Sequence, residues 1–155
     1  IIQAGGGCGM YPRLLKQMFK HVYTFEPDSY NFHCLVQNCT DPDIYKFNAV
    51  LGDKNQMISF RSPHLENRGV GQLGQDHGPV PMLKIDDFEF ESLGMIYLDT
   101  EASETLIMYG AFNNIQRHSP LIACEDSRVF EQLKLYGYEE LGKFGYDTFY
   151  KRLPQ

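Results

Sequence analysis

The sequence has no tryptophan and only four cysteines, and what it lacks sets the first limits on its function. The cysteine spacings match no zinc or CxxC pattern, and a chain of 155 residues needs no disulfides to form a core, so we interpret the cysteines as buried thiols. No apolar run approaches the roughly 18 residues of a membrane-spanning helix, and no basic segment followed by an apolar one opens the chain. We therefore interpret the protein as cytoplasmic, without a membrane partner.

The chain also lacks an excess of basic residues. Its 14 Lys and Arg against 20 Asp and Glu give a formal net charge of −6, whereas nucleic acids and anionic membranes require clustered positive charge. We expect no nucleic-acid partner. No repeat, linker or low-complexity stretch divides the sequence, so residues 1–155 are expected to form one domain. Because an apolar segment without an initiator Met opens the chain, this domain is compatible with an N-terminal extension. The oligomeric state is not predicted.

What the sequence does contain is an alternation of short apolar segments with amphipathic ones. Buried strands are predicted at residues 1–4, 21–26, 44–53, 57–62, 94–98 and 120–125. Amphipathic helices are predicted at 11–20, from Asp28 or Ser29 to about 38, and across 103–115. This order is typical of an α/β fold with a mostly parallel central sheet and helices on both faces.

Three further segments are expected to depart from this alternation. Residues 136–152 are predicted to form an antiparallel hairpin around a turn at 142–145. Residues 63–81 lack periodicity and are predicted to form a long loop, a type of segment that is often functional. Residues 81–90 are expected to form a short strand that runs into a helical turn capped by Asp86 or Asp87.

The distinctive polar residues follow the predicted strands. Gly5, Gly7 and Gly9 follow the first strand, Glu26 ends the second, and Asp53 comes after the third. Carboxylates also follow the later strands, at Asp99, Glu101 and Glu125. Open α/β sheets bind ligands outside the carboxyl ends of their strands, so these residues are expected to lie around one site.

The glycine turn and Glu26 indicate a nucleoside ligand. Glycines let backbone approach a ligand closely, and an acid at the end of the second strand of such folds binds the two hydroxyls of a ribose. The dinucleotide pattern GxGxxG fits poorly, because Met10 stands where its third glycine belongs. The glycines give GxGxG instead, and no GK[ST] follows, which excludes a P-loop.

Four segments in this order carry a more specific resemblance: "IIQAGGGCG", "FEPDSYNF", "NAVLGD" and "IYLDTEASE", with "YGYEELGK" near the end. Over nearly its whole length the chain resembles an FkbM-type methyltransferase. That family belongs to the Rossmann-like class I methyltransferases, so the resemblance implies S-adenosylmethionine as cofactor. It also implies a small polar acceptor, with a sugar as the favoured class.

The resemblance also implies roles for particular residues. The cofactor-binding residues are expected to be Gln3, Gly5, Gly7, Gly9, Tyr11, Glu26, Pro27, Leu51, Asp53 and Asp99. The sequence departs from the family at Gln3, where an acid is usual, at Gly7, where Asn is common, and at Ala102, where glycine is usual. A neutral Gln3 would bind the cofactor's ammonium group less strongly than an acid.

Several polar residues are candidates for acting on the acceptor. Asp99 and Glu101 are expected to serve as the base, and Glu104, His64 and His77 to bind the acceptor. Glu101 and Glu104 would also stabilise the start of a helix, which is a purely structural role. No ligand spacing indicates a metal site.

Two other functions stay open on the sequence. One is a nicotinamide-dependent oxidoreductase on a similar sheet, which Met10 and the lack of a catalytic Tyr/Lys or His pair disfavour. The other is a non-catalytic binding module with the same fold, since fold does not fix function.

Overall fold

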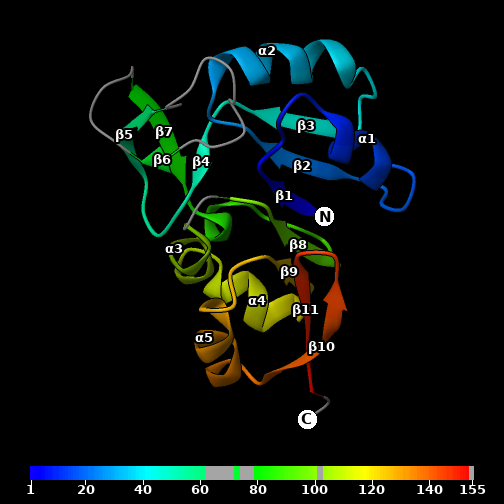
Figure 1. Ribbon diagram of the computed structural model, residues 1–155, viewed down its shortest axis with the longest axis vertical. Coiled ribbons are helices and arrows are strands. Elements are labelled where there is room, and N and C mark those ends of the chain that lie inside the picture. The colour runs from blue at the N-terminus through cyan, green and yellow to red at the C-terminus, as the bar shows by residue number, and fades with distance from the viewer. Residues whose placement is uncertain (62–71, 74–78, 101–102, 154–155) are drawn as a thin grey trace.

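The structure is a computed structural model that describes residues 1–61, 72–73, 79–100 and 103–153. Its centre is a seven-stranded sheet in the order β10-β11-β9-β8-β1-β2-β3 (Figure 1). From β9 to β3 the neighbours run parallel, whereas β10 and β11 form an antiparallel hairpin and β11 pairs with β9. The strands are β1 (Ile2–Ala4), β2 (Val22–Phe25), β3 (Ile44–Phe47), β8 (Met95–Leu98), β9 (Leu121–Cys124), β10 (Tyr138–Phe144) and β11 (Asp147–Arg152). The predicted α/β fold with a C-terminal hairpin is confirmed.

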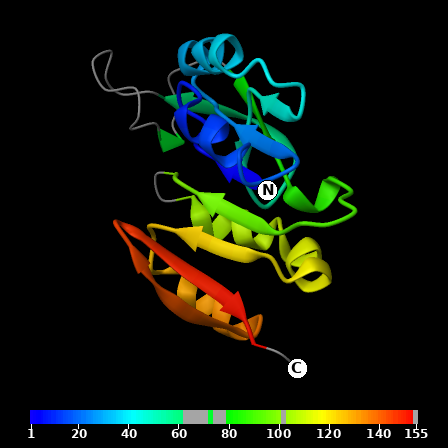
Figure 2. The ribbon, with the colours of Figure 1, turned by 90° about the vertical axis from the view of Figure 1, so that its right-hand side faces the viewer.

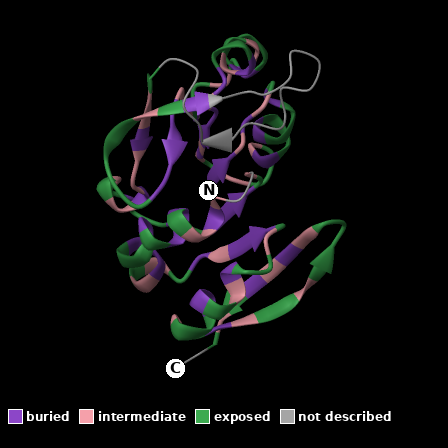
Figure 3. Ribbon diagram, turned by 60° about the vertical axis from the view of Figure 1, so that its left-hand side comes forward, coloured by how far each residue is buried: buried purple, intermediate pink, exposed green. Residues whose placement is uncertain are grey.

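Helices lie on both faces of this sheet, as predicted (Figure 2). On one face are α1 (Met10–Leu15) and α2 (Ser29–Asn38), whose Leu15 and Leu35 belong to one buried cluster with Val22. On the other face, apolar side chains of the later helices form a larger cluster with those of β1, β8 and β9. Those helices are α3 (Glu104–Tyr109), α4 (Phe112–His118) and α5 (Val129–Leu135). The inner strands β1 and β8 are buried along their whole length (Figure 3), as is usual for parallel strands.

The helix ends follow from local sequence chemistry. Asp28 caps α2, because its carboxylate accepts hydrogen bonds from the backbone N–H groups of Tyr30 at 3.0 Å and Asn31 at 2.9 Å. After α5, Gly137 has a φ of 82°, which a glycine adopts at low cost and which turns the chain into β10. Such caps fix where each helix begins and ends, and thereby where the loops at the strand ends lie.

A smaller sheet, in the order β4-β7-β5-β6, stands beside the carboxyl ends of the central strands. Its strands are β4 (Val50–Leu51), β5 (Gln56–Arg61), β6 (Gln72–Leu73) and β7 (Pro79–Leu83), followed by the short helix η1 (Ile85–Asp87). The prediction of a loop over 63–81 is wrong where β6 and the start of β7 lie. Residues 62–71 and 74–78 are outside the described residues.

Two predicted elements are shorter than expected. The first helix ends at Leu15, not at residue 20, and the following residues form tighter turns such as Met18 N–H to Leu15 C=O at 2.9 Å. The third strand is divided, because Asn48 donates its side-chain amide to the carbonyl oxygens of Glu26 and Pro27. After this bend the chain leaves the central sheet and β4 joins the smaller one.

The helix predicted across 103–115 is also broken, at Gly110. A Cβ atom at Gly110 would overlap the carbonyl oxygen of Gly52, which directly follows β4. The backbone at Gly110 therefore lies too close to the end of β4 for a residue with a side chain. Asp86 does not cap its own turn but accepts from the backbone N–H groups of Asn113 and Asn114, both at 2.9 Å, at the start of α4. Lys84 stands at the cap of η1 instead of either aspartate.

The cysteines are free thiols, and their burial differs from the prediction in one case. Cys39 and Cys124 are buried and Cys34 is half-buried, but Cys8 is exposed. In the part of the chain that the structure describes, no helix has the length and apolar character needed to cross a membrane.

Candidate functional site

A cavity of about 320 Å³ lies at the carboxyl ends of β1, β2 and β8, next to the smaller sheet. Open α/β sheets bind ligands at this position, and small-molecule sites have volumes of about 300 to 1,000 Å³. Among the described residues, its charged lining residues are Glu26 and Asp99, and none is a Lys, Arg or His. Apolar side chains complete the lining, among them Phe25, Leu51 and Phe60.

The glycine loop, residues 5–9, forms one wall of the cavity through residues 5–8, whereas Gly9 does not line the cavity and lies against Cys39 and Leu35. Gly5 has a φ of 87°, and a Cβ atom there would overlap the carbonyl oxygen of Asp99. Only glycine meets both conditions at low cost. The N–H groups of Gly5 and Gly6 both donate to the carbonyl oxygen of Phe25 at 3.0 Å, so the loop turns across the end of β2. It presents bare backbone to the cavity, as the glycine pattern predicts.

Glu26 stands at the end of β2 and is only 5% exposed. Its Oε2 accepts a hydrogen bond from the N–H of Gly7 at 2.7 Å, and its Oε1 accepts one from the N–H of Asp28 at 2.8 Å. Burial raises the pKa of Glu26 to about 7, against the opposing effect of these hydrogen bonds and of the Asn31 side chain. A carboxylate has about four lone-pair sites, so it can still accept hydrogen bonds from a ligand.

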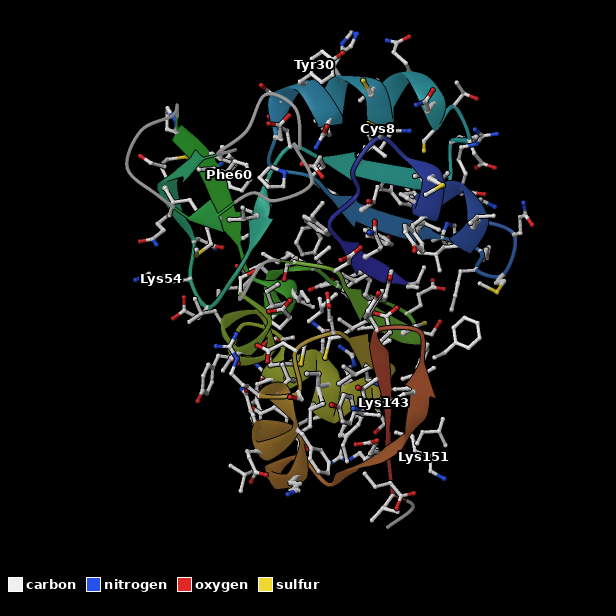
Figure 4. The ribbon with its side chains drawn as sticks, in the orientation of Figure 1. Cys8, Tyr30, Lys54, Phe60, Lys143 and Lys151 are labelled. Atoms are coloured by element: carbon white, nitrogen blue, oxygen red, sulfur yellow. The ribbon has the colours of Figure 1, made fainter. Side chains whose placement is uncertain are left out.

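Helix α2 is tied to the glycine loop both near its start and at its end. The Sγ of Cys8 lies 3.8 Å from the Oδ1 of Asn31, and Asn38 donates its side-chain amide to the carbonyl oxygen of Cys8 at 2.8 Å. Figure 4 shows Cys8 on the loop beneath α2, while Phe60 comes from the smaller sheet. Pro27, half-buried, also lines the cavity. The loop, Glu26 and α2 therefore form one hydrogen-bonded unit.

Gln3 corrects an expectation, because its side chain has no exposed surface and does not line the cavity. Gln3 pairs in register with Thr24, whose hydroxyl donates to its Oε1 at 2.5 Å. Its Nε2 donates to the carbonyl oxygens of Gly5 at 2.7 Å and Ala4 at 3.3 Å. The amide is thus used inside the protein to hold the start of the glycine loop, and an acid could not make these two donations.

Leu51 and Asp53, both expected to bind the cofactor, are placed differently by the structure. Leu51 is buried in β4 and lines the cavity. Asp53 is exposed and does not line it, because the bend at Asn48 takes the chain into the smaller sheet and past the cavity. The expected contact between Asp53 and the cofactor is therefore corrected.

Asp99 and Tyr11 border the cavity on the side of β8. Asp99 follows β8, and its N–H donates to the carbonyl oxygen of Ala4 at 3.1 Å. Tyr11 lines the cavity, is 44% exposed, and has its ring centroid 5.8 Å from that of Tyr97 in β8. Tyr11 therefore contacts the sheet and lines the cavity, and its expected contact with the cofactor stays a prediction.

Glu104 does not line the cavity and is 1% exposed. Burial raises its pKa, and the charge of Asp126, after β9, raises it further. Glu104 is thus not part of this cavity, and its expected contact with the acceptor stays a prediction. Glu101, His64 and His77 are outside the described residues.

Some lining residues were not predicted from the sequence. They are Cys8, Met10, Ala49, Val50, Phe60, Thr100, Ser103 and Ile107. Phe60 belongs to the smaller sheet, and no local periodicity in the sequence indicates that this sheet lies beside the glycine loop. Thr100 and Ser103 are sequence neighbours of carboxylates that were predicted site residues. This adjacency was the one signal in the sequence for these two residues.

Comparisons with known proteins bear on the fold. No family model matches the chain, and no curated protein matches it at a significant level. Among solved structures, it is similar to the crystal structure of the methyltransferase FkbM from Methylobacillus flagellatus, with a TM-score of 0.68 and 19% sequence identity. The chain has the fold of that methyltransferase. The similarity covers 97% of this chain but 42% of the other, so the chain spans less than half of that protein's length.

Proposed function

We propose that this domain is an S-adenosylmethionine-dependent methyltransferase that acts on a small polar acceptor, and that it holds the cofactor between the glycine loop and Glu26. The observation that carries the proposal is the Glu26 carboxylate, which is buried at the cavity wall and bonded to the N–H of Gly7. Burying a carboxylate is costly. That cost is understandable where the group binds the hydroxyls of a ligand.

The residues around the cavity fit the parts of an adenosyl ligand. A ribose needs a hydrogen-bond acceptor, and the Glu26 carboxylate has lone pairs free of the two backbone donors. An adenine needs apolar contact, which Leu51 and Phe60 supply on the side of the smaller sheet. The methionine part needs close approach to backbone, which Gly5 and Gly7 allow.

When bound, S-adenosylmethionine supplies an electrophilic methyl group on a positively charged sulfur. We propose that Asp99, which lines the cavity beside the glycine loop, stabilises positive charge there and is the base that accepts a proton from the acceptor. Glu101 shares this proposed role as a base. The half-exposed ring of Tyr11 covers the same side of the cavity and keeps water from it.

The acceptor class is part of the proposal. The resemblance to the FkbM family favours the hydroxyl of a sugar, and a lining without Lys, Arg or His among the described residues disfavours acceptors that carry phosphate. His64 and His77 stay candidates for binding the acceptor. Positioning of the two reactants is expected to supply most of the acceleration.

Calorimetric titration with S-adenosylhomocysteine and, separately, with NAD tests the proposal. We expect S-adenosylhomocysteine to bind and NAD to bind far more weakly. Tighter binding of NAD would favour an oxidoreductase instead, and binding of neither would favour a non-catalytic module.

A further inference from the structure

Three of the four cysteines lie where the glycine loop meets α2. Cys8 is in the loop, Cys34 is within α2, and Cys39 directly follows that helix. Cys8 is exposed and lines the cavity, Cys34 is half-buried, and Cys39 is buried. A small reagent from solution can therefore reach Cys8 and Cys34, whereas Cys39 is enclosed. The proposed function uses none of these thiols.

One face of α2 holds the loop at Cys8. The Sγ of Cys8 lies 3.8 Å from the Oδ1 of Asn31, and Asn38 donates its side-chain amide to the carbonyl oxygen of Cys8 at 2.8 Å. Residues 31, 34 and 38 are three and four positions apart, so their side chains share one face of the helix. Figure 4 shows Cys8 beneath this helix. Cys34 thus stands between two residues that both contact Cys8.

The thiols of Cys8 and Cys34 are in contact. Burial raises the pKa of Cys8, and the Cys34 thiol, with which Cys8 shares a side-chain hydrogen bond, raises it further. The carboxylates of Glu26 and Asp28 act in the same direction. Cys8 is therefore a neutral thiol at pH 7 and reacts with an oxidant through a small thiolate fraction. Two thiols that meet from a loop and a helix are positioned to join in a disulfide.

Cys39 contacts the loop in a different way. Its Sγ donates a hydrogen bond to the carbonyl oxygen of Gly9 at 3.4 Å. A Cβ atom on Gly9 would lie only 2.7 Å from this sulfur, so Cys39 packs closely on the backbone of the loop. Its buried thiol supports the loop, and the accessible pair is Cys8 with Cys34.

We propose that Cys8 and Cys34 are a modification site, which a peroxide oxidises to a reversible disulfide that weakens ligand binding in the cavity. The Cys8 thiolate attacks hydrogen peroxide, forms a sulfenic acid and releases hydroxide, which takes up the proton lost by Cys8 to give water. The Cys34 sulfur then attacks the sulfenic sulfur, and a second water leaves with the Cys34 proton. Two thiols and one peroxide thus give one disulfide and two waters.

The disulfide would change the wall of the cavity. Bonded sulfurs lie closer together than sulfurs in nonbonded contact, so Cys8 has to move toward α2. The preceding Gly7, whose N–H donates to the Oε2 of Glu26 at 2.7 Å, would move with it. Among the described residues nothing lies within 4 Å of a Cβ position at Gly7, so the loop has room to shift. Formation of the disulfide is independent of the proposed function, whereas its effect on cofactor binding rests on that function.

Peptide mapping tests for the disulfide. The reduced wild-type protein is treated with hydrogen peroxide, its free thiols are alkylated, and its peptides are analysed by mass spectrometry without reduction. We expect a link between Cys8 and Cys34 that dithiothreitol removes. The link should persist in Cys39→Ser, which keeps a donor for the Gly9 carbonyl, and be absent in Cys34→Ser. A link from Cys8 to Cys39, a link between two copies of the chain, or no disulfide at Cys8 overturns the inference.

Calorimetry with S-adenosylhomocysteine tests the effect on the cavity. We expect the oxidised wild type to bind about tenfold more weakly than the reduced protein, as for one lost hydrogen bond to a charged group, and dithiothreitol to restore binding. Cys8→Ser is the control, and peroxide should leave its own affinity unchanged. Equal affinity of oxidised and reduced wild type, or an equal loss in Cys8→Ser, overturns the inference. If the reduced wild type does not bind this ligand, the proposed function fails, while the peptide map still decides whether the disulfide forms.

Discussion

Glu26 and Glu104 are both buried glutamates at the carboxyl edge of the central sheet, and their surroundings differ. Both oxygens of Glu26 accept hydrogen bonds from backbone N–H groups, whereas Oε2 of Glu104 has no partner among the described residues. The glycine loop region supplies its carboxylate with protein donors before any ligand arrives. The pKa of Glu104 is raised by burial and by the charge of Asp126, and its side chain does not line the cavity. The difference indicates that Glu26 is preorganised by backbone donors at the cavity wall, whereas Glu104 is buried away from the cavity.

The largest effect is expected at Gly5, in the glycine loop region. Gly5→Ala places a methyl group against the carbonyl oxygen of Asp99 and demands an unfavourable φ of 87°. We expect a loss of about 3 kcal/mol or more in the free energy of unfolding, measured by urea denaturation. Gly7→Asn is the control, because the space at Gly7 is open and Asn tolerates a φ of 51°. Equal stability of the Gly5→Ala variant would contradict the close contact.

A second substitution would place beside the glycine loop a buried carboxyl that, like that of Glu104 among the described residues, lacks donors for all its oxygens. Gln3→Glu removes the donor to the carbonyl oxygen of Gly5 and buries a carboxylate beside it. At pH 8 we expect a cost of about 2 to 3 kcal/mol in the free energy of unfolding. The folded-state pKa of this new carboxyl would be raised, so the variant should regain stability as the pH falls.

Thermal denaturation at pH 5 and pH 8 measures this dependence, with the exposed Gln17→Glu as control. A Gln3→Glu variant that is as stable as the wild type at pH 8 and binds S-adenosylhomocysteine more tightly would restore the idea that residue 3 contacts the cofactor.

The third change compares a glutamate that lines the cavity with one that does not. Glu26→Ala is expected to weaken S-adenosylhomocysteine binding more than tenfold, since hydrogen bonds to a charged group contribute about 1.5 to 3 kcal/mol. Glu125→Ala, after β9 and outside the cavity lining, should change this affinity less than twofold. Calorimetry on both variants gives the comparison. Equal losses in the two variants would contradict a specific contact between Glu26 and the ligand.

The smallest effect concerns pH. The pKa of Glu26 is about 7, and ligand hydroxyls that donate to it favour its ionised form. Affinity for S-adenosylhomocysteine should therefore rise severalfold between pH 6 and pH 8, with protons released on binding near pH 7. In the absence of ligand, the stability of the fold changes with pH in the opposite direction. Because the pKa of Glu26 is raised in the folded state, its contribution lowers the free energy of unfolding as the pH rises from about 4.5 to about 7. Titrations in buffers of different ionisation enthalpy measure the released protons.

The sequence predicted the features that depend on neighbouring residues. The strands, the glycine turn and the cap at Asp28 all follow from short patterns of apolar, glycine and acidic residues. Their position at one edge follows because parallel strands end on the same side of a sheet. The fold and the wall formed by Gly5, Gly7 and Glu26 were therefore accessible from the sequence.

What the sequence did not predict depends on partners far along the chain. Asp86 caps α4, 27 residues away at Asn113, and Asn48 bends the third strand by bonding to Glu26, 22 residues before it. Gln3 was assigned to the ligand from the family resemblance, since its partner Thr24 lies on another strand and no local pattern pairs the two. Such pairs leave no local periodicity, so the turn of the chain at Asn48 and the apolar wall from Phe60 needed the structure.

A crystal structure with S-adenosylhomocysteine tests the central claim most directly. The account predicts that the ligand's ribose hydroxyls lie within hydrogen-bonding distance of the Glu26 carboxylate, with its adenine against Leu51 and Phe60. A ligand bound elsewhere, or bound without contact to Glu26, would contradict it.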